Sequence, residues 1–254
     1  MAFWNRTRRR QELLAESFSE TSRATLRQHV RHYSFLSDAQ RRRLEDFVKI
    51  LVAEKDWVGG SGFQLTEAMK VTISGYAGIM TIGLEEPYYF DRLMTIIVYP
   101  GAYMPHSRFE QHMPLGASDP RLGESWQHGP IVLSWSEIVG DEKRRPGNNL
   151  VIHEFAHHVD SLDGDVDGSP PLVNRQQGRE WYRVSEAEFA RLRSEAASGQ
   201  ATLLDRYGAK NRAEFFAVAS ECFFERPHAL SQRHPELYQV LAAIYRQDLT
   251  SWLP

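Results

Sequence analysis

Two histidines and a glutamate stand at a spacing that suits metal-assisted hydrolysis. Residues 151–160 contain His153, Glu154 and His157 in the pattern His-Glu-x-x-His. At about 100° per residue, the two histidines lie about 40° apart on one helix face, so both imidazoles can bind one ion. Glu154 then lies beside that ion, where it can hold a zinc-bound water and remove its proton. The pattern therefore predicts one Zn²⁺ ion and hydrolysis of peptide bonds.

The residues around this motif favour a buried helix. Val151, Ile152, Phe155 and Ala156 are apolar, as the inward face of such a helix requires. The alternative is a core helix whose histidines only bond to neighbouring groups, and we favour the metal site over it. His158 lies about 100° round the helix from His157, so we expect it to be structural.

A catalytic zinc site of this kind needs a third protein ligand and keeps a fourth position open. A histidine six residues after His157 would be one solution, but Asp163 stands there. A glutamate from a later helix is the other, and residues 212–221 offer Glu214 and Glu221. Seven positions apart, they share one helix face, about 10.5 Å apart along its axis. Residues 211–214 also resemble a capping box, so spacing leaves both glutamates open.

The elements that must position these residues are mainly helical. Ser37 and Gln40 form a capping box that opens a helix, and a second helix is expected over about residues 66–82, where glycines allow close packing. Later helices are expected over residues 149–162, 175–197, 212–225 and 235–245. Two β-branched runs, at residues 94–99 and 131–135, indicate strands. The order predicts an α+β fold, mainly helical, with a small β-sheet.

Composition bounds the function classes. The 254 residues carry 30 basic and 33 acidic side chains, a net charge of −3, which disfavours direct nucleic-acid binding. One cysteine excludes an internal disulfide and suits a reducing cytoplasm. The most apolar stretch, residues 71–84, is shorter than the roughly 20 residues of a membrane span. We expect a basic N-terminal segment over residues 1–34, helical or frayed, and one zincin-like domain over residues 35–254.

Two strings carry a resemblance to a known family. Residues 207–217, together with residues 153–160, resemble the gluzincin peptidases of the lethal-factor type. They are closer still to the Mlc titration factor A family of bacterial cytoplasmic zinc peptidases. Residues 66–83, 98–100 and 123–135 also match that family's pattern, so the resemblance covers most of the chain from about residue 35 onward.

This resemblance implies a site and two functions. The metal ligands correspond to His153, His157 and Glu214, and the catalytic glutamate corresponds to Glu154. Tyr207 corresponds to a tyrosine whose hydroxyl stabilises the oxyanion formed on the peptide carbonyl. The family implies aminopeptidase-type cleavage of short peptides, although the choice between exo- and endopeptidase stays open. It also implies binding of a transcriptional repressor of sugar-uptake genes, so a non-catalytic regulator with a structural zinc is the alternative.

One departure from many gluzincins concerns the residue that orients a ligand histidine. Four positions after Glu214 stands Val218, which cannot accept a hydrogen bond from an imidazole. Two acids remain as candidates for that role, Asp160 and Glu221, and the sequence leaves the choice between them open. The resemblance further implies that the small β-sheet lies beside the active-site helix, with residues 131–135 as an edge strand at the cleft, where an extended peptide pairs with it. The residues themselves are equally compatible with an ordinary apolar strand of the sheet.

Overall fold

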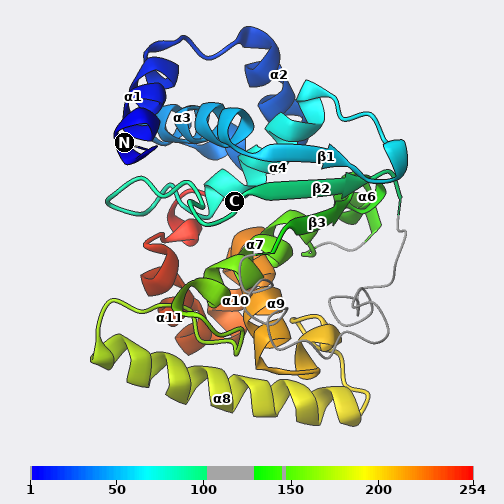
Figure 1. Cartoon of the computed structure of the whole chain (residues 1–254). Helices are drawn as coiled ribbons and strands as arrows, with labels where there is room; N and C mark the ends of the chain where they lie inside the picture. Colours follow the sequence, from blue (N-terminus) through cyan, green and yellow to red (C-terminus); the bar gives the residue numbers. More distant parts are fainter. Residues whose placement is uncertain (1, 102–128, 145–146, 254) are drawn as a thin grey trace, which may run out of the picture.

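Helices dominate the chain and surround a small sheet (Figure 1). The computed structural model describes residues 2–101, 129–144 and 147–253. The α-helices are α1 (Ala2–Ala15), α2 (Glu20–His29), α3 (Asp38–Glu54), α4 (Glu67–Ile79), α6 (Trp135–Arg144), α7 (Leu150–Asp160), α8 (Arg175–Ala197), α9 (Arg212–Glu225), α10 (Pro227–Arg233) and α11 (Pro235–Tyr245). The strands are β1 (Asp56–Gly59), β2 (Thr95–Tyr99) and β3 (Ile131–Ser134). The predicted α+β class is confirmed.

Helices α2 and α3 pack on α4 at the N-terminal end of the molecule. The hydroxyl of Ser37 accepts the backbone N–H of Gln40, and the Gln40 side chain accepts the N–H of Ser37, so the predicted capping box begins α3. The glycines of α4 allow the expected close approach. A Cβ added to Gly78 would lie 2.4 Å from Leu44 Cδ1, and one on Gly75 would meet α2 as closely as 2.7 Å.

The basic N-terminal segment is helical, and its arginines bond to the rest of the protein. Arg6 and Arg10 both reach Glu54 at the end of α3, with N···O distances of 2.8 and 2.7 Å. Both also pair with Asp91. In α2, Leu26 is fully buried in the same apolar cluster as the later helices. The division of the chain at residue 35 remains a prediction.

All three strands run parallel, in the order β1-β2-β3. In β2 the buried side chains alternate, with Ile96 and Val98 facing the core. In β3, Ile131 and Leu133 are buried while Val132 is 41% exposed. Among the described residues β3 pairs only with β2, so it forms one edge of the sheet.

Helix α7 lies at the centre of the molecule, between the sheet and the C-terminal helices (Figure 1). Helix α7 packs against β3, α4 and α9, while the long helix α8 lies along the far end of the molecule from α1. From Phe215 to Glu225 every residue of α9 is buried, so this helix is the core of the C-terminal half. Only the first turn of α9 is not fully buried, and this turn can therefore present side chains toward α7.

Several elements agree with the sequence and some do not. Helices α8, α9 and α11 have the predicted bounds. Strand β1 and helices α6 and α10 were not predicted, because each is only four to ten residues long and a period is hard to recognise over so few residues. Within the described part of the chain, no helix combines the length and the apolar character that crossing a membrane requires.

Candidate metal centre

Helix α7 holds the two motif histidines on one face. Its first turn is fixed by Asn149, whose side-chain oxygen accepts the backbone N–H of Ile152 at 3.2 Å. The opposite face, with Ile152 and Phe155, is fully buried. His153 and His157 remain about one-eighth exposed, with side-chain exposures of 12% and 15%, and their ring centroids lie 4.8 Å apart. The predicted spacing therefore brings both imidazoles together.

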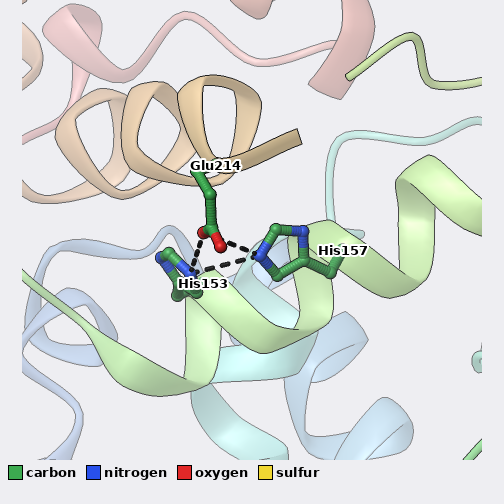
Figure 2. Close-up of side chains that lie close together, drawn as sticks. All are labelled: His153, His157 and Glu214. Carbon is green, nitrogen blue, oxygen red and sulfur yellow. Dashed lines mark hydrogen bonds and ion pairs between the residues drawn. The ribbon is translucent and has the colours of Figure 1, made fainter. Parts of the chain in front are cut away.

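Helix α9 delivers a carboxylate to the same point. The side chain of Asn211 caps this helix by accepting the backbone N–H of Glu214 at 2.8 Å. The carboxylate of Glu214 is then free to extend toward α7, and Figure 2 shows it between the two imidazoles. The capping box suggested by residues 211–214 is therefore only half present, because the Glu214 side chain bonds to the histidines instead.

The three side chains converge on one small volume. Glu214 Oε2 lies 3.2 Å from both His153 Nε2 and His157 Nε2, and the two nitrogens are themselves 3.2 Å apart. Ligands at about 2.1 Å from one tetrahedral ion lie about 3.4 Å from one another. The observed triangle fits an ion within a few tenths of an ångström. Among the described residues, no other group of histidine, cysteine and acidic side chains has this arrangement.

The electrostatics of the triangle favour a bound cation. Burial lowers the pKa of His153, but the negative charge of Glu221 and the hydrogen bond with Glu214 outweigh it and raise that pKa well above its usual value. Burial raises the pKa of Glu214, but its bonds with the two histidines hold it well below its usual range. The site therefore carries excess negative charge that needs protons or a metal ion as partner.

Glu221 orients His153 by contacting the ring nitrogen that faces away from Glu214. Its Oε1 lies 2.7 Å from His153 Nδ1, which leaves Nε2 for an ion. Its Oε2 accepts the backbone N–H of Asn149, the N-cap residue of α7, at 2.7 Å. The other candidate, Asp160, instead accepts the backbone N–H of Gly168 at 2.8 Å. Glu214 and Glu221, seven positions apart on α9, therefore contact the two different nitrogens of the His153 imidazole.

Tyr207 lies in a short 3-10 helix, η4 (Arg206–Ala209), just before α9. Its hydroxyl donates to Glu214 Oε1 at 3.0 Å, on the oxygen that does not touch the histidine nitrogens. The ring centroid lies 6.1 Å from that of His153. The structure therefore brings Tyr207 into the same cluster as the three expected ligands.

Two further residues of the motif have clear places. Glu154 follows His153 on α7 and is half-buried. His158 is buried, with its ring centroid 5.6 Å from that of Phe90, so it leaves the metal face as expected. The helix predicted over residues 149–162 includes Asn149, which the structure instead shows as the N-cap residue before α7, a typical position for asparagine. Of the string at residues 123–135, only residues 129–135 lie within the described residues.

Comparison with known proteins adds a family. The model of the glucose-regulated metallo-peptidase M90 family matches residues 4–246. The uncharacterized protein slr2042 of Synechocystis sp. is 35% identical over 87% of this chain and 82% of its own length. Mlc titration factor A of Cronobacter sakazakii is 31% identical over 84% of this chain and 81% of its own. The protein of the same name from Escherichia coli O7:K1 is 30% identical over 84% of this chain and 81% of its own length.

Proposed function

Because the chain belongs to the glucose-regulated metallo-peptidase M90 family, we propose that it is a peptidase that depends on one zinc ion. The ligands in this proposal are His153, His157 and Glu214. The observation that supports it is the triangle of two nitrogens and one oxygen, each 3.2 Å from the others. Two imidazoles and one carboxylate are a donor set typical of catalytic zinc, which keeps a fourth position open.

Zinc, when bound, supplies a Lewis acid that polarises a carbonyl and lowers the pKa of water. Glu154 acts as the general base: it accepts a proton as the water oxygen attacks the peptide carbonyl carbon. It then gives this proton to the leaving nitrogen as the carbon–nitrogen bond breaks. Tyr207 donates a hydrogen bond from its hydroxyl to the developing oxyanion. To do so, the hydroxyl must turn away from Glu214 Oε1.

Strand β3 suggests how a peptide would lie. It is an edge of the sheet among the described residues and packs against α7, the helix of the motif. An extended peptide could add to this edge through main-chain hydrogen bonds, which would hold it along α7. We propose short peptides as substrates and aminopeptidase-type cleavage. Matched peptides with free and acetylated amino termini separate an exopeptidase from an endopeptidase.

The test is the substitution Glu154→Gln. It removes the base and keeps the shape of the side chain, so we expect hydrolysis of fluorogenic peptides to be lost while zinc content by elemental analysis is unchanged. Glu12→Gln, an exposed change on α1, is the matched control and should leave the rate unaffected. Persistent hydrolysis in the Glu154→Gln protein would reject Glu154 as the base.

A second function has support from the names of the relatives. Several of them are called Mlc titration factor A, so we propose that this chain also binds a transcriptional repressor of that kind in the cytoplasm. Binding needs a surface and no chemistry, so the Glu154→Gln protein should retain it in a pull-down with purified repressor. A protein that binds the repressor and cleaves no peptide would favour the non-catalytic alternative, with a structural zinc.

Direct nucleic-acid binding has less support. In the basic run at residues 6–10, Arg6 and Arg10 are paired with carboxylates, as described above. Arg8 pairs with Glu12, and Arg9 donates to the carbonyl of Ala53. These arginines are therefore already engaged with the protein itself, and a DNA backbone would have to replace those partners.

A further inference from the structure

A cavity of about 690 Å³ lies beside the metal centre and contains none of its ligands. It is open to solvent on one side and is lined by the loop after α7, by one face of α8 and by the start of α9. Ala213 lines it and directly precedes Glu214 in sequence, so one wall of the cavity continues into the third proposed ligand. The proposed chemistry uses no residue of this cavity.

Buried contacts fix the walls of the cavity in advance. Gly168, which lines it, donates its N–H to Asp160 and accepts the indole N–H of Trp181 on its carbonyl at 2.9 Å. Gly168 has φ +84°, and a Cβ there would lie 2.3 Å from the carbonyl oxygen of Arg212. The loop is therefore held between α7, α8 and α9, and the cavity exists before anything binds.

The lining combines an aromatic floor with an apolar rim. Trp181, Phe189 and Phe215 are almost fully buried beneath the cavity. On the rim, Tyr182 is 64% exposed and Val166 is 49% exposed, and both line the cavity. Large apolar side chains exposed next to a concave surface are typical of sites that bind another protein segment.

Two cations of the lining lack a carboxylate partner among the described residues. Arg212 is paired, with its Nη2 3.0 Å from Glu186 Oε2. Arg193 lies 5.7 Å from the ring centroid of Phe189, and Lys210 lies 5.7 Å from that of Tyr207. Neither cation forms an ion pair within the described ranges. The cavity thus offers two positive charges to a ligand with carboxylates.

We propose that this cavity binds an acidic peptide segment of a partner protein, with an apolar side chain seated on the aromatic floor. The free cations at Arg193 and Lys210 match carboxylates, and the exposed rim matches an apolar side chain. Aromatic and basic groups also suit single-stranded nucleic acid. The apolar rim at Val166 and Tyr182 favours a peptide, because a peptide can carry an aliphatic side chain and a nucleic acid cannot.

The experiment measures binding directly, so its outcome is independent of peptidase activity. The probe is a fluorescein-labelled hexapeptide with a central Leu-Phe pair and two acidic residues on each side, blocked at both ends. Its binding to the full Glu154→Gln chain, in which the proposed base is absent, is followed by fluorescence anisotropy. A peptide with lysines in place of the acidic residues is the matched control. We expect the acidic peptide to bind at least about tenfold more tightly, since like charges repel the basic one.

Single charge reversals locate the site. Arg193→Glu and Lys210→Glu should each weaken binding of the acidic peptide about tenfold or more, and Tyr182→Ala should also weaken it. Arg42→Glu, an exposed reversal on α3 far from the cavity, should leave binding unchanged. Circular dichroism confirms that each variant is folded. Absent binding, equal binding of both peptides, unchanged binding in Arg193→Glu and Lys210→Glu, or displacement by a single-stranded oligonucleotide would overturn the proposal.

Discussion

The side chain of Glu221 touches both the proposed metal centre and the start of the helix that carries it. One oxygen faces His153 Nδ1, and the other accepts the N–H of Asn149. Partners of this kind fix the orientation of a ligand imidazole, and their loss typically lowers metal affinity about 10–100-fold. We expect Glu221→Ala to lower zinc affinity by this amount, as measured by competition with a chromophoric chelator.

Two comparisons make that prediction specific. Glu221→Gln should recover part of the affinity, because an amide oxygen can still accept the imidazole N–H. Asp160→Asn should leave zinc affinity close to that of the wild type, because Asp160 bonds to Gly168 and not to a ligand. An equal loss in the Glu221 and Asp160 variants would show that neither side chain acts specifically on His153.

Tyr207 has two possible roles, and one substitution separates them. Tyr207→Phe keeps the ring and removes the hydroxyl that donates to Glu214. If the hydroxyl stabilises the oxyanion, kcat should fall about 10²–10³-fold, the loss typical of one such donor, with KM and zinc content unchanged. A loss of zinc with a smaller effect on the zinc-saturated rate would instead mean that the hydroxyl positions Glu214.

At the scale of elements, α1 is attached to α3 through one nearly buried carboxylate. The side chain of Glu54 is 7% exposed and bonds to Arg6 and Arg10. Burial raises its pKa, but these hydrogen bonds outweigh burial and lower the pKa from 4.5 to about 2. Since the folded-state pKa is the lower one, this pairing stabilises the fold above about pH 4.5 and is lost as pH falls toward 2.

Arg10→Ala tests this attachment. We expect it to lower the free energy of unfolding by about 1–3 kcal/mol at pH 7, between the values for exposed and buried pairs. The difference from the wild type, measured by urea denaturation, should shrink as pH falls from 5 toward 2. Arg8→Ala removes an arginine from the same helix whose side chain is 80% exposed, and should cost less than about 0.5 kcal/mol. Equal costs would contradict the role of Glu54.

At the scale of the whole molecule, the proposed ion joins two helices that meet only in the folded state. A ligand that binds only the native protein stabilises it by about 4 kcal/mol when its concentration is 1,000 times Kd. We therefore expect a chelator to lower the melting temperature, added zinc to restore it, and the chelator to have no effect on His153→Ala. An unchanged melting temperature in the wild type would count against a metal bound by both helices.

Local signals in the sequence predict much of this molecule. Helix α8 follows from its apolar periodicity, helix α9 from an apolar run after the capping residue Asn211, and the histidine pair from the motif alone. The acid that bonds to His153 Nδ1 could be predicted only as either Glu221 or Asp160. The choice between them depends on how α9 crosses α7, which the sequence does not specify locally. Likewise, the arginines of α1 bond to Glu54 and Asp91, which are 44 and 81 positions from Arg10. Such distant pairings have no local signature.

The ligand pair His157 and Glu214 is separated by 57 positions, and the 23 residues of α8 lie within that interval. An ion bound at both ends would close this interval into a loop, as a covalent cross-link does. Closing a loop of this length lowers the conformational entropy of an open chain. In the native protein the two ends of the loop are already close together, so binding the ion does not lower that entropy a second time. If a protease cut the loop before α8, the two fragments would be joined by packing and by coordination bonds, and only the second of these is reversed by a chelator.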